Sequence, residues 1–148
     1  MSRLIEIVEA VAAKINESEL IEPVTAEVDY APQFDLPDMR QLHVTVAASL
    51  DPKIPAAEET PADRRLTQHD LAVDVAVLKK IDDRAEVPPL IDTAEAIRGL
   101  LRQADLGDVG EYRWTGTTVH TLCDPEQLKA RRMFMAVATY HYRIHEEG

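Results

Sequence analysis

Residues 69–81 read HDLAVDVAVLKKI, and this stretch decides the class of fold. Its side chains fall into two alternating sets, which are Leu71, Val73, Val75 and Val77 on one side and Asp70, Ala72, Asp74 and Ala76 on the other. A period of two is that of a β-strand with two distinct faces. The run is longer than the usual strand of about five or six residues. We therefore expect a long strand that extends beyond the core as one arm of a hairpin.

Four more segments have the features of strands. Residues 24–30 and 42–50 alternate apolar and polar side chains, and residues 111–122 are rich in Thr, Tyr, Trp and Val, which favour extended backbone. The segment 132–145, RMFMAVATYHYRIH, has apolar residues on both sides, as is typical of a strand covered on both faces. We expect this last strand to lie in the middle of the sheet or at an interface.

Two segments predict the main helices. In residues 2–17 apolar side chains recur at every third or fourth position, which is the spacing of one face of a helix. Residues 90–104 have the same spacing and follow Pro88 and Pro89, so we expect the second helix to begin after these prolines.

Particular residues predict how the helices begin and pack. Asp92 and Glu95 have the spacing of a capping box at the start of the second helix. Gly99 lies inside that helix, where glycine costs about 1 kcal/mol relative to alanine, and predicts close packing against a neighbour. Asp124 is a favourable N-cap and Pro125 a favourable first residue, so a short third helix is expected over 125–131.

This order of elements favours an α+β fold. Few regular βαβ units are present, so we expect an antiparallel or mixed sheet of about four to five strands with two main helices packed on it, plus a short third helix. The 148 residues suffice for one domain, and we expect a single domain over residues 1–148. Residues 51–68, DPKIPAAEETPADRRLTQ, have three prolines and no periodicity and are expected to form a long, flexible interaction loop.

The charge of the chain bears on its partners. There are 16 Lys and Arg against 27 Asp and Glu, a formal net charge of -11, and an acidic surface repels nucleic-acid phosphates. No apolar run approaches the roughly 20 residues that cross a bilayer. Glu6 and Glu9 interrupt the first apolar segment, where a secretory signal would be unbroken. We expect synthesis in the cytoplasm, no membrane partner and no sequence-specific DNA binding.

The residue pattern does not predict catalysis. The pairs His120 with Cys123 and His141 with His145 supply two ligands each, whereas a structural zinc site needs four. No serine lies in a G-x-S-x-G elbow, and the glycines form no phosphate-binding loop. We therefore predict a protein that is not an enzyme, with no catalytic, metal-binding or cofactor-binding residues.

Candidate interface residues lie around the long loop and the strands beside it. Arg64 and Arg65 stand in the loop, where arginine can pair with a partner's carboxylates through two contacts at once. Gln68 and His69 stand where the loop passes into the long strand, and Arg40 precedes the second strand. For Arg64 and Arg65 the alternative is a solvent-exposed tether without a partner.

Three parts of the sequence together resemble a known family. They are FDLPDMRQLHVTVAAS at 34–49, the pattern R-x-x-Q-H-D-L-A-V-D-V-A-V-L-K-K that ends at Lys80, and DPEQLKARRMFMAVATYHYR at 124–143, with Trp114 between the last two. In these features the chain resembles bacteriophage tail-terminator proteins, also called tail-completion or neck proteins, over residues 25–143.

The resemblance implies a structural subunit of the virion tail or neck. Such subunits form a ring, typically a hexamer, that caps the tail tube, ends tube polymerisation and joins the tail to the head connector, with DNA passing through the lumen. The acidity of this chain would keep such a lumen from holding DNA. Two alternatives stay open: a head-completion or connector-adaptor protein of the same region, and a small ligand-binding α+β domain with a site near Trp114, His120 and Tyr140.

Overall fold

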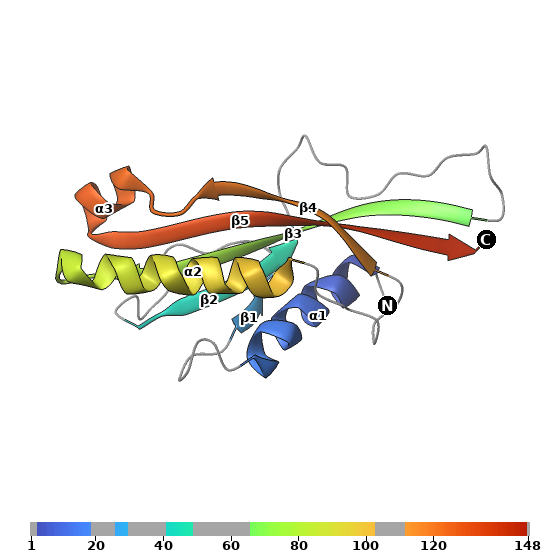
Figure 1. Ribbon diagram of the computed structural model, residues 1–148, viewed down its shortest axis with the longest axis horizontal. Coiled ribbons are helices and arrows are strands. Elements are labelled where there is room, and N and C mark those ends of the chain that lie inside the picture. Colours follow the sequence, from blue (N-terminus) through green and yellow to red (C-terminus); the bar gives the residue numbers. More distant parts are fainter. Residues whose placement is uncertain (1–2, 19–25, 30–40, 49–65, 103–111, 148) are drawn as a thin grey trace.

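The computed structural model describes residues 3–18, 26–29, 41–48, 66–102 and 112–147 (Figure 1). The elements are α1 (Arg3–Glu17), β1 (Ala26–Asp29), β2 (His43–Ala48), β3 (Leu66–Lys80), the 3-10 turn η1 (Arg84–Glu86), α2 (Val87–Leu101), β4 (Tyr112–Thr121), α3 (Pro125–Arg131) and β5 (Met133–Glu147). The α+β class, the two main helices and the short third helix are confirmed.

The five strands form one mixed sheet in the order β1-β2-β3-β5-β4. Only β1 and β2 are parallel, and the other neighbours are antiparallel. The strand predicted over 132–145 therefore lies between two others. The long strand, expected to be one arm of a hairpin, pairs antiparallel with β2, the strand before it in the sequence, and on its other side with β5, the last strand.

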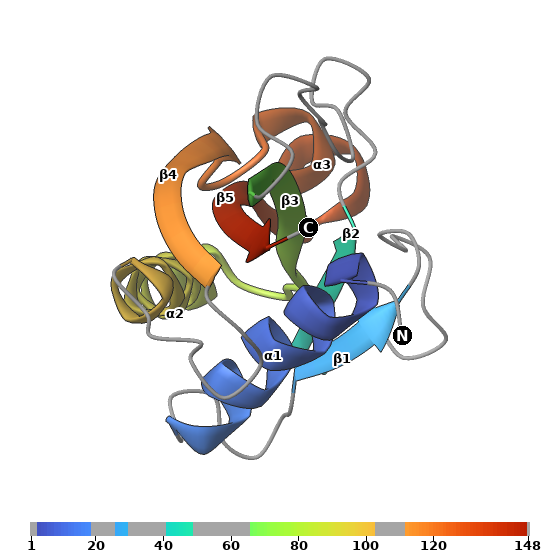
Figure 2. The same cartoon turned by 90° about the vertical axis from the view of Figure 1, so that its right-hand side faces the viewer.

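The two main helices cover one face of the sheet (Figure 2). Ile7, Val11 and Ile15 of α1 are fully buried, in agreement with their helical spacing. The side chain of Asn16 accepts a hydrogen bond from the Ala26 amide at 2.7 Å and donates one to the Ala26 carbonyl at 3.3 Å. This pair ties the end of α1 to the edge strand β1.

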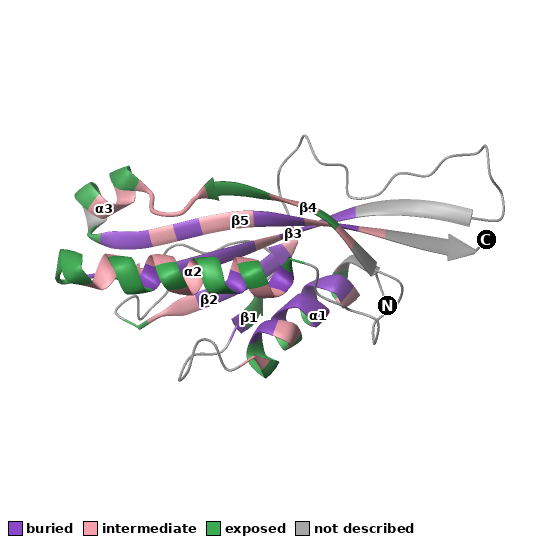
Figure 3. Cartoon of the chain, in the orientation of Figure 1, coloured by how far each residue is buried: buried purple, intermediate pink, exposed green. Residues whose placement is uncertain are grey.

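The sheet is buried on both sides over its middle (Figure 3). The helix-covered face carries Val44, Val75, Val77, Phe134 and other residues of the main core. The opposite face carries a smaller cluster of Ala76, Leu78 and Met133, and Leu78 is fully buried there. Burial on both faces explains why β5 reads as an almost continuous apolar run.

Strands β3 and β5 are paired along their whole length, from Leu66 opposite Glu147 to Lys80 opposite Met133. β2 lies beside β3 only from Val73 to Leu78. From Leu66 to Ala72, β5 is thus the only strand beside β3 within the described part of the chain. This outer stretch, the ribbon, projects beyond the two helices (Figure 1).

The start of α2 differs from the prediction. Pro88 and Pro89 lie within the first turn of the helix, which tolerates proline because its amides have no partner inside the helix. The capping box is formed by Asp83 and Glu86 at η1, and not by Asp92 and Glu95.

Gly99 also differs from the prediction. A Cβ at this position would meet no atom within 4 Å, so the glycine does not mark close packing.

Candidate functional site

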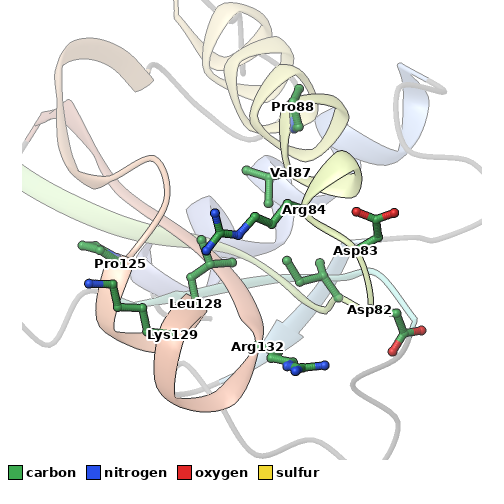
Figure 4. Close-up of a pocket in the computed structure, with 10 residues that line it drawn as sticks. Asp82, Asp83, Arg84, Val87, Pro88, Pro125, Leu128, Lys129 and Arg132 are labelled. Carbon is green, nitrogen blue, oxygen red and sulfur yellow. The ribbon is translucent and has the colours of Figure 1, made fainter.

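A groove lies at the end of β3 and β5 that is opposite the ribbon (Figure 4). Its volume is about 850 Å³. The apolar lining is Ile81, Val87, Pro88, Pro125 and Leu128. The charged lining is Asp82, Asp83, Arg84, Lys129 and Arg132. Because the turn after β3 forms one wall and α3 the other, we call it the α3 groove.

Hydrogen bonds fix the wall that follows β3. The carboxylate of Glu86 accepts from the amide of Asp82 at 2.7 Å and from that of Asp83 at 3.0 Å. Its other oxygen lies 2.6 Å from the Lys79 ammonium. The hydrogen bond from Lys79 and those from the two amides lower the pKa of Glu86 from 4.5 to about 2. The carboxylate therefore stays ionised and holds the turn in one conformation.

The second wall is the short helix α3. Asp124 caps it by accepting hydrogen bonds from the amides of Glu126 at 2.9 Å and Gln127 at 3.2 Å. This confirms the predicted N-cap and the predicted helix. At the far end, the Ile81 amide donates to the Arg132 carbonyl at 2.8 Å. That bond joins the two walls, because Ile81 follows β3 and Arg132 precedes β5.

Arg132 has an unusual backbone conformation. Its φ of 50° and ψ of 41° are left-handed, and it is the one residue other than glycine with positive φ in the described chain. Helices commonly end in this conformation with glycine, which has no Cβ to clash. An arginine here retains a long cationic side chain at the groove at a cost of about 1–2 kcal/mol.

The groove exposes three cations in an otherwise acidic protein. Arg84, Lys129 and Arg132 are exposed, and none forms an ion pair with another described residue. Figure 4 shows the Arg84 side chain pointing toward α3, whereas the carboxylates of Asp82 and Asp83 point away from it. The α3 groove therefore combines an apolar floor with three cations that form no ion pair within the described part of the chain, which suits an acidic and partly apolar segment.

A second polar arrangement crosses the sheet on the face away from the main helices. Thr139 of β5 is fully buried and donates its hydroxyl proton to Asp74 of β3 at 2.6 Å. The same hydroxyl lies 2.7 Å from Nε2 of His120 in β4. Since a hydroxyl has one proton to donate, Nε2 of His120 is the donor in the second bond.

This chain of groups is not a nucleophilic triad. A triad needs a histidine that accepts the proton of the hydroxyl, and here the proton goes to Asp74. In addition, Thr139 has no exposed surface for a substrate to reach. The network links three neighbouring strands and serves the fold.

The remaining candidate groups are unreactive in their surroundings. Burial, with a smaller effect of the Asp124 charge, raises the pKa of the Cys123 thiol, so the thiol is not activated as a nucleophile. Burial also raises the pKa of Tyr140 to about 12 and raises that of Tyr142. No cluster of three or more His, Cys, Asp or Glu that could hold a metal ion is found among the described residues.

The predicted interface residues are placed only in part. Arg40, Arg64 and Arg65 lie outside the described residues. Gln68 and His69 belong to the ribbon, where they pair with His145 and Ile144. β3 begins at Leu66, so the last three residues assigned to the loop 51–68 are part of a strand, and the interaction loop itself stays a prediction.

The alternative ligand site near Trp114, His120 and Tyr140 is not formed. Trp114 and Tyr140 belong to the main core on the helix-covered face, where the Trp114 indole donates to Thr117 at 3.0 Å. His120 lies on the opposite face, bonded to Thr139. A β-bulge between Trp114 and Gly116 changes the alternation of β4, which is why sequence spacing does not reveal this separation.

Sequence reasoning missed the α3 groove. Its walls come from residues 81–88 and 125–132, which are far apart in the chain and meet only because β3 and β5 are neighbours. The available signal was the pattern Asp83-x-x-Glu86, a capping-box spacing that places a turn directly after the long strand.

Comparison with known proteins gives little guidance. No protein-family model matches the sequence. No curated protein matches it either. One solved structure that does match is the sheath/tube terminator of an extracellular contractile injection system, PVC, in the extended state, determined by cryo-EM. The sequence identity is 14% and the TM-score 0.42, and the match covers 98% of this chain but 57% of that chain. So distant a likeness carries no functional argument, and the proposals below rest on this chain's own residues.

No helix within the described ranges is long and apolar enough to cross a membrane.

Proposed function

We propose that this chain is a structural subunit of a ring, a hexamer, that caps a phage-type tail tube. In this role it ends tube polymerisation and presents a surface to the head connector, and DNA passes through the lumen without sequence-specific contacts. The protein would thus reside in the tail or neck of the virion and would act as a structural component rather than as an enzyme.

The observation that carries the proposal is the ribbon. A strand whose edge has no partner offers backbone amides and carbonyls to another chain, and monomeric proteins usually shorten or cover such edges. Here β3 continues from Val73 out to Leu66 with β5 alone beside it in the described chain. The ribbon begins at the core residues Leu71 and Tyr142 and extends beyond them, and such an extension is useful to a protein that contacts neighbours and of little use to a small monomer.

Two sequence features support the same role. The runs at 34–49, 65–80 and 124–143 resemble tail-terminator proteins. The first contains β2, the second contains β3, and the third contains α3 and β5 as far as Arg143. The net charge of -11 disfavours adhesion to DNA that passes through a lumen.

Polymerisation of the cognate tail-tube protein tests the proposal. Purified tube protein is allowed to assemble with and without this chain, and tube lengths are measured by electron microscopy. We expect shorter tubes with a ring at one end. Tubes of unchanged length that bind no copy of this chain would contradict the proposal. Binding to portal-side proteins instead of the tube would indicate a connector adaptor.

The predicted loop can be tested in the same assay. Deletion of residues 54–62 should leave a folded protein that no longer binds tube protein, since the core strands and helices lie elsewhere in the sequence. Normal binding by the deletion variant would show that the loop is not the tube contact. Far-UV circular dichroism is the control for folding.

A further inference from the structure

We propose that the outer end of the ribbon of one subunit docks in the α3 groove of the next. We call this end the ribbon tip, and it comprises Leu66–Asp70 of β3 and Ile144–Glu147 of β5. The inference rests on the proposed ring and names the contact that would build it.

The placement of the two surfaces shows that a second copy is needed. β3 begins at the ribbon tip and ends beside the groove at Lys80, and β5 runs the opposite way from Met133 to Glu147. A strand of this length spans roughly 45–50 Å at a rise of about 3.3 Å per residue. The tip of a subunit therefore cannot reach the groove of the same subunit.

The groove has the size and lining for a strand end. Its volume of about 850 Å³ lies in the upper part of the range of roughly 300–1,000 Å³ that is usual for binding pockets. Ile81, Val87 and Leu128 give it an apolar floor. The pairing of Leu66 with Glu147 and of Thr67 with Glu146 fixes the backbone of the tip in advance, so docking would order little additional chain.

The charges of the two ends are complementary. The groove exposes Arg84, Lys129 and Arg132, none in an ion pair with another described residue. By sequence, β5 ends in Glu146 and Glu147. Opposite charge on two separate surfaces of one molecule favours contact between copies and disfavours tip-to-tip or groove-to-groove pairing.

Such a contact is heterologous, because it joins two different surfaces of identical subunits. Repetition of a heterologous contact generates a ring when the rotation between subunits closes. The proposed capping ring needs this type of contact.

Two complementary variants test the docking. The groove variant is Arg84→Glu with Lys129→Glu, and the tip variant is Glu146→Lys with Glu147→Lys. Each should lose the ring, measured by light scattering alone and with tube protein. The two variants mixed should form a ring again, in which the two kinds of subunit alternate. The intact tip of the groove variant meets the intact groove of the tip variant, and the reversed tip of the tip variant meets the reversed groove of the groove variant. A chain with all four substitutions should regain the ring.

The control variant is Asp92→Lys with Glu95→Lys. It changes the net charge of the chain as much as the tip variant does, but both positions are exposed on α2, away from the tip and from the groove. It should form rings like the wild type. Rings formed by either the groove or the tip variant, or a mixture that stays monomeric, would overturn the docking. A wild-type chain that forms no ring, alone or on the tube, would overturn the proposed function as well, so the two failures are distinguishable.

Discussion

Replacement of Thr139 by valine tests whether the polar network across the sheet stabilises the fold. Thr139 is fully buried between β3 and β4, and its hydroxyl donates to Asp74 at 2.6 Å and accepts from His120 at 2.7 Å. Valine keeps the shape of threonine but cannot form either bond. The change therefore removes two hydrogen bonds and leaves almost no cavity.

The magnitude follows from the partners. A hydrogen bond to a charged group contributes about 1.5–3 kcal/mol, and a bond between neutral groups about 0.5–1.5 kcal/mol. Valine at position 139 also recovers some apolar transfer energy, so we expect Thr139→Val to lower the free energy of unfolding by about 2–3 kcal/mol. For a chain of 148 residues this corresponds to a fall in Tm of roughly 5–10 °C.

Urea denaturation followed by the fluorescence of Trp114, the only tryptophan, measures this difference. The matched control is Thr139→Ser, which keeps the hydroxyl and removes one methyl group, with an expected loss of about 1 kcal/mol. Valine should thus be more harmful than serine. A valine variant as stable as the wild type, or more stable than the serine variant, would refute a stabilising role for the network.

Three further predictions concern single positions. Gly99→Ala should stabilise the protein by about 0.5–1 kcal/mol in urea denaturation, because a Cβ there meets nothing within 4 Å and alanine is the better helix former. A loss of stability would mean that the helix packs closely at this point. Tyr142→Phe should leave the Tm unchanged or raise it slightly, since the buried Tyr142 hydroxyl has no hydrogen-bond partner among the described residues, and a fall by several degrees would reveal one. The hydrogen bonds that lower the pKa of Glu86 also stabilise the folded state. This contribution to the free energy of unfolding is complete above about pH 4.5, the ordinary pKa of the group, and is lost as the pH falls through about 2. Acid unfolding of Glu86→Gln should therefore be less dependent on pH across this window than that of the wild type, and identical pH profiles would contradict the assignment.

Much of the fold follows from patterns that are local in the sequence. The alternation around Val73 and Val75 predicts β3, the apolar run from Met133 predicts a strand covered on both faces, and Asp124 marks the start of α3. Each of these signals depends on the spacing of neighbouring residues, which secondary structure fixes directly.

The features that sequence could not give depend on contacts between distant segments. β5, the last strand, pairs along the whole of β3 on the side away from β2, and no local pattern in the sequence reveals this pairing. The groove forms only where Ile81 and Leu128 come together across that pairing. The start of α2 was misplaced because Pro88 and Pro89 are equally compatible with a loop and with the first turn of a helix.

The mass of the chain in solution, measured by light scattering alone and with the cognate tail-tube protein, tests the central claim most directly. Six copies of a 16.6 kDa chain have a mass of about 100 kDa. We expect a species of that size, either free or bound to the end of the tube. A monomer of 16.6 kDa that is indifferent to the tube protein would contradict the claim that this chain works as a ring.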